Sequence, residues 1–143
     1  MPTKGELLRL QKLYRTDKKI ADALLRAHKR GVRIRIITDP SALYSRFSKM
    51  VQLHERGIPV YIYNMRSEKQ KGGTLNNIMH NKFVIFSKNK NDCAYVWTGS
   101  FNFTRSAALS NQENALLIGK RDIVNQYKTQ FERLITRSNR LKE

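Results

Sequence analysis

The sequence predicts a single α/β domain that spans all 143 residues. Twice in the first half, an amphipathic helical stretch ends at a glycine and a strand-like stretch follows it directly. Residues 17–31 lead into residues 32–39, and residues 48–57 lead into residues 58–63. Helix, glycine and strand in this order form the repeating unit of α/β folds. A chain of this length is large enough to bury one core but not two.

Residues 6–63 contain these N-terminal α/β units. Leucines at helical spacing predict a short amphipathic helix over residues 6–14. In the next helix, Asp17 is a typical N-cap and Gly31 fits the C-cap position. The strand over residues 32–39 closes at an Asp-Pro pair, because proline restricts the residue before it.

The second half contains three apolar stretches that predict strands and one amphipathic stretch that predicts a closing helix. The strands are at residues 83–86, 94–97 and 115–118, and the helix is at residues 122–135. Four other segments lack a regular apolar period: residues 65–77 predict a mobile loop, 87–92 a hairpin turn, 104–110 a short helix or turn, and 137–143 a frayed basic end.

The charge balance points to a polyanionic partner. The chain has 28 lysines and arginines against 11 aspartates and glutamates, which gives a formal charge of +17 at pH 7. Solvation of helix faces needs charges of either sign, whereas so one-sided an excess costs self-repulsion and suits binding to phosphates. The composition therefore favours a nucleic acid, DNA or RNA, as partner.

Composition also excludes several classes of protein. The single cysteine, Cys93, excludes an internal disulfide, and the three histidines have no zinc-binding spacing, so no metal site is expected. No run approaches the roughly 20 apolar residues of a membrane span, so we expect no stable membrane insertion. The start of the chain lacks a secretory apolar stretch, which favours a cytoplasmic location.

Two short motifs carry the candidate chemistry. His80 and Lys82 stand two residues apart at the start of the strand at residues 83–86. Residues i and i+2 of a strand point to the same face, so the imidazole and the ammonium group can meet one ligand. Ser100 and Asn102, also two apart, follow the next predicted strand. A nucleophile or acid, a fixed cation and two neutral donors together suit a phosphodiester.

These residues, His80-x-Lys82 and Gly99-Ser100-x-Asn102, resemble the signature of the phospholipase D superfamily, and its small single-motif nucleases in particular. The resemblance runs from about Thr16 to Phe131. It implies a phospholipase D-like sandwich, in which helices flank a mixed central sheet, with a shorter N-terminal part than the family has. The motif half spans residues 79–119. One position departs from the pattern, since Ser87 stands where the family has aspartate; Asp92, in the following loop, is a candidate substitute.

The resemblance implies hydrolysis without a metal or other cofactor. His80 would attack phosphorus and form a phosphohistidine, and the same histidine of a second copy would protonate the leaving oxygen. One motif per chain therefore implies a homodimer. Lys82, Ser100 and Asn102 would hold the phosphate oxygens, and Glu113 would accept a hydrogen bond from the far nitrogen of the His80 ring.

Two neighbouring residues have open roles. Phe101 would either stack on a base or pack in the core, and Arg105 would either bind a phosphate or remain an exposed helix charge. The function also has alternatives. The favoured prediction is a metal-independent phosphodiesterase acting as an endonuclease. A non-catalytic nucleic-acid-binding module that kept the phosphate pocket is the second, because of Ser87 and the short N-terminal part. A phospholipid phosphodiesterase is the third, since basic charge also suits anionic lipids.

Overall fold

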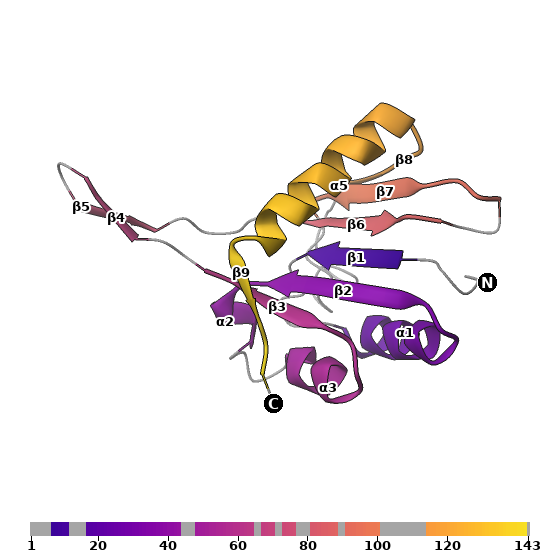
Figure 1. Ribbon diagram of the computed structural model, residues 1–143, viewed down its shortest axis with the longest axis horizontal. Coiled ribbons are helices and arrows are strands. Elements are labelled where there is room, and N and C mark those ends of the chain that lie inside the picture. Colours follow the sequence, from indigo (N-terminus) through magenta and orange to yellow (C-terminus); the bar gives the residue numbers. More distant parts are fainter. Residues whose placement is uncertain are drawn as a thin grey trace.

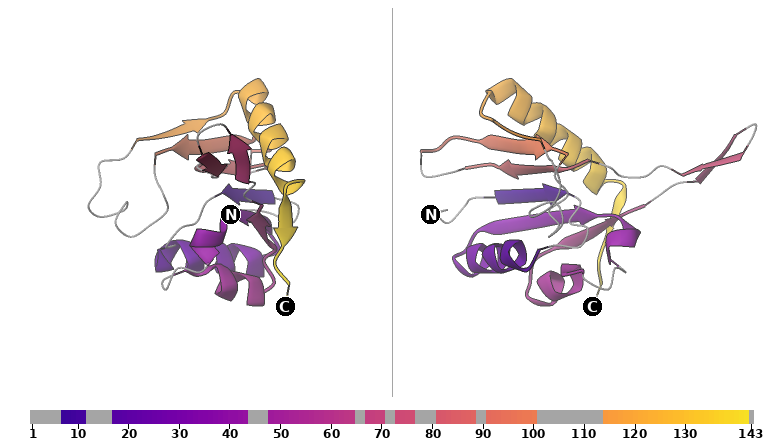
Figure 2. Two further views of the ribbon diagram at one scale, coloured as in Figure 1. Left: turned by 90° about the vertical axis from the view of Figure 1, so that its left-hand side faces the viewer. Right: turned by 180° about the vertical axis from the view of Figure 1, so that it is seen from behind.

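The computed structural model describes residues 7–11, 17–43, 48–64, 67–70, 73–76, 81–88, 91–100 and 114–142. Within these ranges, a seven-stranded mixed sheet is covered by helices, and a separate hairpin projects from it (Figures 1 and 2). In spatial order the strands are β8 (Ala115–Ile118), β7 (Tyr95–Gly99), β6 (Phe83–Phe86), β1 (Leu7–Gln11), β2 (Arg33–Thr38), β3 (Val60–Tyr63) and β9 (Ser138–Arg140). This is the mixed sheet flanked by helices that the sequence predicts.

The directions of the strands determine which strand ends lie at the same edge of the sheet. Strands β1, β2 and β3 run parallel, whereas β6 is antiparallel to β1, β7 to β6 and β8 to β7. The carboxyl ends of β2, β3 and β7 therefore share one edge of the sheet with the first residues of β6 and β8. We call this the carboxyl edge and define it by five residues: Thr38, Tyr63, Lys82, Ser100 and Asn114.

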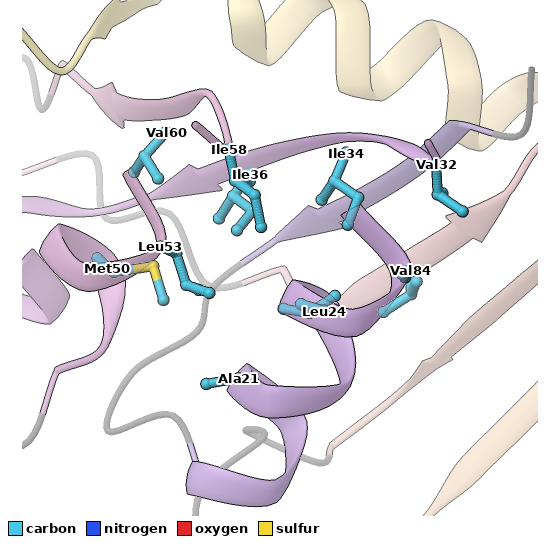
Figure 3. Packing of buried hydrophobic residues seen from close by; sticks show 11 residues of the cluster. Ala21, Leu24, Val32, Ile34, Ile36, Met50, Leu53, Ile58, Val60 and Val84 are labelled. Carbon is cyan, nitrogen blue, oxygen red and sulfur yellow. The ribbon is translucent and has the colours of Figure 1, made fainter. Parts of the chain in front are cut away.

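Two apolar clusters hold helices against the sheet. Helices α1 (Lys18–Lys29) and α3 (Met50–Glu55) pack on one face, where Leu24 and Leu53 belong to one buried cluster with Ile36 (Figure 3). Helix α5 (Arg121–Ile135) belongs to the second cluster, in which Phe131 is completely buried. The short helix α2 (Pro40–Leu43) follows β2. Among the described residues, no helix is long and apolar enough to cross a membrane.

The local signals for α1 work as the sequence indicates. The Asp17 side chain accepts a hydrogen bond from the backbone N–H of Lys19 at 2.8 Å, which satisfies one of the unpaired donors of the first turn. Gly31 and Gly57 follow α1 and α3 with φ of 91° and 90°, a conformation that side chains with a Cβ disfavour. Both α/β units therefore begin and end close to the predicted residues.

The prediction of a helix at residues 6–14 is wrong. Leu7–Gln11 is strand β1, which lies in the middle of the sheet between β2 and β6. The strand reads Leu-Leu-Arg-Leu-Gln, and in so short a stretch its three leucines are compatible with both strand and helical spacing. Pairing with two neighbouring strands, which local spacing does not reveal, decides the outcome.

Two further predictions are corrected. Within the expected loop at 65–77, β4 (Ser67–Gln70) and β5 (Gly73–Asn76) form an antiparallel hairpin. The expected frayed end contains β9, which pairs with β3, and the Leu141 N–H donates to the Val60 carbonyl at 2.8 Å. Both segments form backbone hydrogen bonds with another strand, which their polar sequences do not indicate. The predicted turn at 104–110 lies outside the described residues.

Candidate active site

Buried polar groups gather at the carboxyl edge. Among the described residues, three polar or charged side chains are buried: Thr38, Asp39 and Lys82, with 0%, 2% and 7% of their surface exposed. Thr38 and Asp39 lie at the end of β2, and Lys82 lies directly before β6, with only β1 between these strands. Burial of charged groups costs free energy that ordinary folding avoids. Their common location therefore indicates a site rather than three separate packing events.

Lys82 is held by the end of the neighbouring strand. Its backbone carbonyl accepts a hydrogen bond from Thr98 Oγ1 at 3.1 Å and another from the Gly99 N–H at 3.4 Å. Because Lys82 is two residues before Val84, its side chain points to the face that α1 covers. The buried Lys82 side chain therefore starts at the carboxyl edge from a backbone whose carbonyl has two hydrogen-bond donors.

The next strand connection places Ser100 beside the start of β8. The Ser100 N–H donates to the Asn114 carbonyl at 3.0 Å, and the Asn114 N–H donates to Ser100 Oγ, also at 3.0 Å. These two bonds continue the β7–β8 ladder by one step past Gly99. Ser100 is therefore fixed by its own side chain at the same edge as Lys82.

Gly99 makes this junction possible. A Cβ added at Gly99 would lie 1.9 Å from the Asn114 carbonyl oxygen and 2.9 Å from Ala115 Cα. Its φ is not positive, so the glycine is required by the close approach of β8 and not by backbone conformation. The glycine of the Gly-Ser motif thus has a structural reason in this chain.

Helix α5 supports the strand ends from the other face. The Tyr127 hydroxyl donates to Thr98 Oγ1 across 3.5 Å, a long contact, and the Tyr127 ring packs edge-to-face on Phe83 with 4.9 Å between centroids. Phe131 makes a second edge contact with Phe83. Thr98 therefore joins α5 to the Lys82 backbone.

Asp39 is a site candidate that the sequence reasoning assigned only to strand closure. Its Oδ1 accepts hydrogen bonds from the Ser41 hydroxyl and, at 3.0 Å, from the Ala42 N–H. These bonds shape the turn from β2 into α2. In the sequence, the Asp-Pro pair after the alternating stretch indicates only where the strand ends. It does not indicate that the Asp39 carboxylate is buried.

The predicted site residues fall into two groups. Lys82 and Ser100 lie at the carboxyl edge, the first directly before β6 and the second directly after the neighbouring strand β7. The other predicted site residues lie outside the described part of the chain: His80, Phe101, Asn102, Arg105 and Glu113. No cluster of three His, Cys, Asp or Glu side chains suited to a metal ion occurs in the described ranges.

The candidate substitute for the missing motif aspartate lies at the other end of β6. Asp92 is exposed, has φ of 60°, and forms an ion pair with Lys88 at 3.0 Å across the β6–β7 turn. Ser87 follows β6 at this same end. Both positions are thus remote from the carboxyl edge, so the departure from the pattern concerns the turn and not the candidate site.

Removing the Thr98 hydroxyl should measurably weaken the strand junction. Thr98→Val keeps the shape of the side chain but deprives the Lys82 carbonyl of a donor, so we expect the free energy of unfolding to fall by about 1 kcal/mol. Urea denaturation measures the change. Thr98→Ser keeps the hydroxyl and is the control; equal losses in both variants would contradict a role for the hydrogen bond.

Comparison with known proteins gives one consistent result. A family model described as "Cardiolipin synthase, PLD-like domain" matches residues 5–135. A phospholipase D of Rickettsia prowazekii is 38% identical over 122 residues, which make up 85% of this chain and 52% of that protein. A mitochondrial cardiolipin hydrolase of Xenopus tropicalis is 36% identical over 115 residues, or 80% of this chain and 48% of that protein. The chain therefore spans about half the length of these curated relatives.

A solved structure shares the fold. The phospholipase D family member Nuc from Salmonella typhimurium superposes with a TM-score of 0.75 at 25% identity, and the match covers 99% of this chain and 84% of that one. The superposition therefore includes both the α/β units and the strands that hold Lys82 and Ser100.

Proposed function

The chain belongs to the phospholipase D-like family, and from this premise we propose that it is a metal-independent phosphodiesterase that cleaves nucleic acids as a homodimer. The observation that carries the proposal is the buried lysine: Lys82 has 7% of its surface exposed and lies beside the Gly99–Ser100 junction. A buried ammonium group at a strand end is well placed to neutralise phosphate oxygens.

The proposed reaction has two steps. An imidazole nitrogen of His80 attacks phosphorus, the bond from phosphorus to the leaving oxygen breaks, and His80 of the second copy donates a proton to that oxygen. Water then attacks phosphorus in the phosphohistidine, the bond from phosphorus to the His80 nitrogen breaks, and the water gives up a proton to the second histidine. Lys82, Ser100 and Asn102 stabilise charge on the phosphate oxygens, and Glu113 orients His80. The histidines and the lysine supply the positive charge in this scheme.

The choice of nucleic acid as substrate is supported by charge. The formal charge of +17 favours a polymer of phosphates, and Phe101 and Arg105 are candidates to contact bases and neighbouring phosphates. The relatives named phospholipase D and cardiolipin hydrolase favour a second candidate, a phospholipid phosphodiesterase with the same chemistry. A binding module without catalysis is the third.

Substrate assays in EDTA distinguish these functions. We expect cleavage of plasmid or single-stranded nucleic acid, and of bis(p-nitrophenyl) phosphate, to persist in EDTA and to disappear in His80→Ala. Hydrolysis of cardiolipin vesicles alone would establish the lipid activity instead. Equal binding of nucleic acid by both proteins, with cleavage by neither, would establish the binding module.

The proposed dimer has an apolar surface available. Strand β8 is an edge of the sheet, and Leu116 and Leu117 are each 64% exposed. Neighbouring residues of a strand point to opposite faces, so both faces are apolar at this edge. Exposed apolar side chains of this kind favour contact with another chain. The scheme requires this contact to use a face of the strand, because pairing of two β8 edges would hold the two β6 strands about 24 Å apart.

Charging this edge should dissociate the dimer. Leu116→Lys together with Leu117→Lys places two charges in the proposed interface, and burial of these charges would cost desolvation free energy. We therefore expect sedimentation velocity to show a monomer. We expect the rate of hydrolysis to fall in parallel. Val51→Lys, at an exposed apolar position on α3, is the matched control. A wild-type protein that sediments as a monomer while it cleaves would contradict the two-histidine scheme.

A further inference from the structure

The β4–β5 hairpin is an arm separate from the body. Its strands pair only with each other in a two-stranded sheet, from Ser67 opposite Asn76 to Gln70 opposite Gly73. Figures 1 and 2 show the hairpin extending away from the seven-stranded sheet and its helices. An isolated two-stranded hairpin is marginally stable in water, so such an arm gains stability from a partner.

Both ends of the arm start from the carboxyl edge. The chain leaves β3 at Tyr63, enters β4 at Ser67, leaves β5 at Asn76 and returns at Lys82. The chain from Asn76 to Lys82 spans at most about 22 Å even when fully extended. The base of the arm is therefore tied to the same edge as the buried lysine, and a ligand reaching past that lysine lies within range of the arm.

The composition of the arm indicates the chemistry of its partner. The strands read Ser-Glu-Lys-Gln and Gly-Thr-Leu-Asn, and Leu75 is the one large apolar residue among them. Such strands offer no apolar face for a membrane or a protein core. In the sequence from residue 66 to residue 71, three basic residues stand against one acid. A polar, basic arm suits a hydrated chain of phosphates.

We propose that the β4–β5 arm binds the nucleic-acid chain beyond the phosphate that is cleaved. This inference rests on the proposed function and adds an extended substrate contact to it. Two paired strands lie about 4.8 Å apart, so a two-stranded ribbon fits the width of a major groove of about 12 Å, and its four-residue strands reach about 13 Å along it. The arm contributes to binding of long substrates and takes no part in the chemical step.

Two variants test the arm. In the first, residues 67–76 are replaced by a short Gly-Ser link; in the second, Lys69→Gln removes one positive charge from β4 without shortening the chain. Lys29→Gln, at an exposed position near the end of α1 and thus at the opposite edge of the sheet, is the matched control. Binding of a 40-nucleotide strand and of a 40-base-pair duplex is measured in the His80→Ala background over a range of salt concentrations, and hydrolysis of bis(p-nitrophenyl) phosphate is measured with His80 present.

Loss of one phosphate contact should lower affinity about 4- to 6-fold near 0.15 M salt and reduce the slope of log K against log salt by about 0.7–0.9. We expect this from Lys69→Gln, a larger loss from the arm replacement, and unchanged hydrolysis of the small substrate in both. Equal effects of Lys69→Gln and Lys29→Gln, or unchanged binding after arm replacement, would overturn the inference. Weaker binding to cardiolipin vesicles with unchanged nucleic-acid binding would also overturn it.

The two proposals fail separately. If wild-type protein does not hydrolyse bis(p-nitrophenyl) phosphate, the proposed chemistry fails, while the binding measurements still decide the role of the arm. If hydrolysis occurs and the arm variants bind long nucleic acids as tightly as the parent protein, only the arm inference fails.

Discussion

Lys82→Met is expected to lower the rate constant of phosphodiester hydrolysis by about 10²- to 10³-fold without unfolding the protein. Methionine approximates the length of the lysine stem but lacks the charge. The phosphate oxygens therefore lose a fixed cation, whose attraction for them grows as negative charge develops in the transition state. Because the backbone carbonyl of Lys82 makes the hydrogen bonds to Thr98 and Gly99, the substitution leaves these contacts in place. Steady-state hydrolysis of bis(p-nitrophenyl) phosphate in EDTA provides kcat and KM separately.

Combination with His80→Ala sharpens this prediction. Loss of the nucleophile should reduce hydrolysis to background, and residues that act as one unit are strongly non-additive. The double variant should therefore be no slower than His80→Ala alone. Lys88→Met, at an exposed lysine beyond the other end of β6, is the charge-matched control and should keep its activity. Equal losses from Lys82→Met and Lys88→Met would show that overall charge, and not the site, governs the rate.

Gly99→Ala is expected to have the largest effect on stability of the changes considered for the sheet. The added Cβ would lie 1.9 Å from the Asn114 carbonyl oxygen, a backbone atom that moves only if β8 moves. Overpacking of this kind costs about 3 kcal/mol, and displacement of β8 also breaks the paired Ser100–Asn114 hydrogen bonds. Urea denaturation should show the loss, and hydrolysis should fall because Ser100 shifts.

Gly119→Ala is the graded control for this prediction. There the new Cβ would lie 2.8 Å from Cε1 of the half-buried Tyr95 ring, which can turn aside more easily than a strand backbone. We therefore expect a smaller loss of stability and no change in hydrolysis. A Gly99→Ala protein as stable as the Gly119→Ala protein would mean that β8 approaches β7 less closely than described.

The elements that sequence reasoning placed correctly have signals within one element. Capping by Asp17, glycines after both helices and short β-branched stretches all act locally, so α1, β2, β6 and α5 begin and end near their predicted residues. Strand β1, the arm and β9 depend on pairing with distant residues. The sequence of β1 fits both helical and strand spacing, and the sequences of the arm and β9 fit neither. In each case pairing with another strand determines the secondary structure.

The candidate site was predictable to a similar degree. The apolar stretches predicted that Lys82 precedes one strand and Ser100 follows the next, and both positions are confirmed. The placement of His80 beside Lys82 stays a prediction, because His80 lies outside the described residues. The sequence does not show that Thr38 and Asp39 are buried at the same edge, because this follows from the order of strands in the sheet. The sequence also does not show why a glycine is required at position 99, because this depends on how closely β8 approaches β7.

Strand β9 has a practical consequence for domain boundaries. The family match ends at residue 135, yet Ser138–Arg140 protects the free side of β3. A shortened polypeptide ending at residue 135 would expose unpaired backbone at both β3 and β8, on opposite flanks of the molecule. Each subunit could then recruit neighbours in two directions, which promotes open-ended stacking in place of a closed pair.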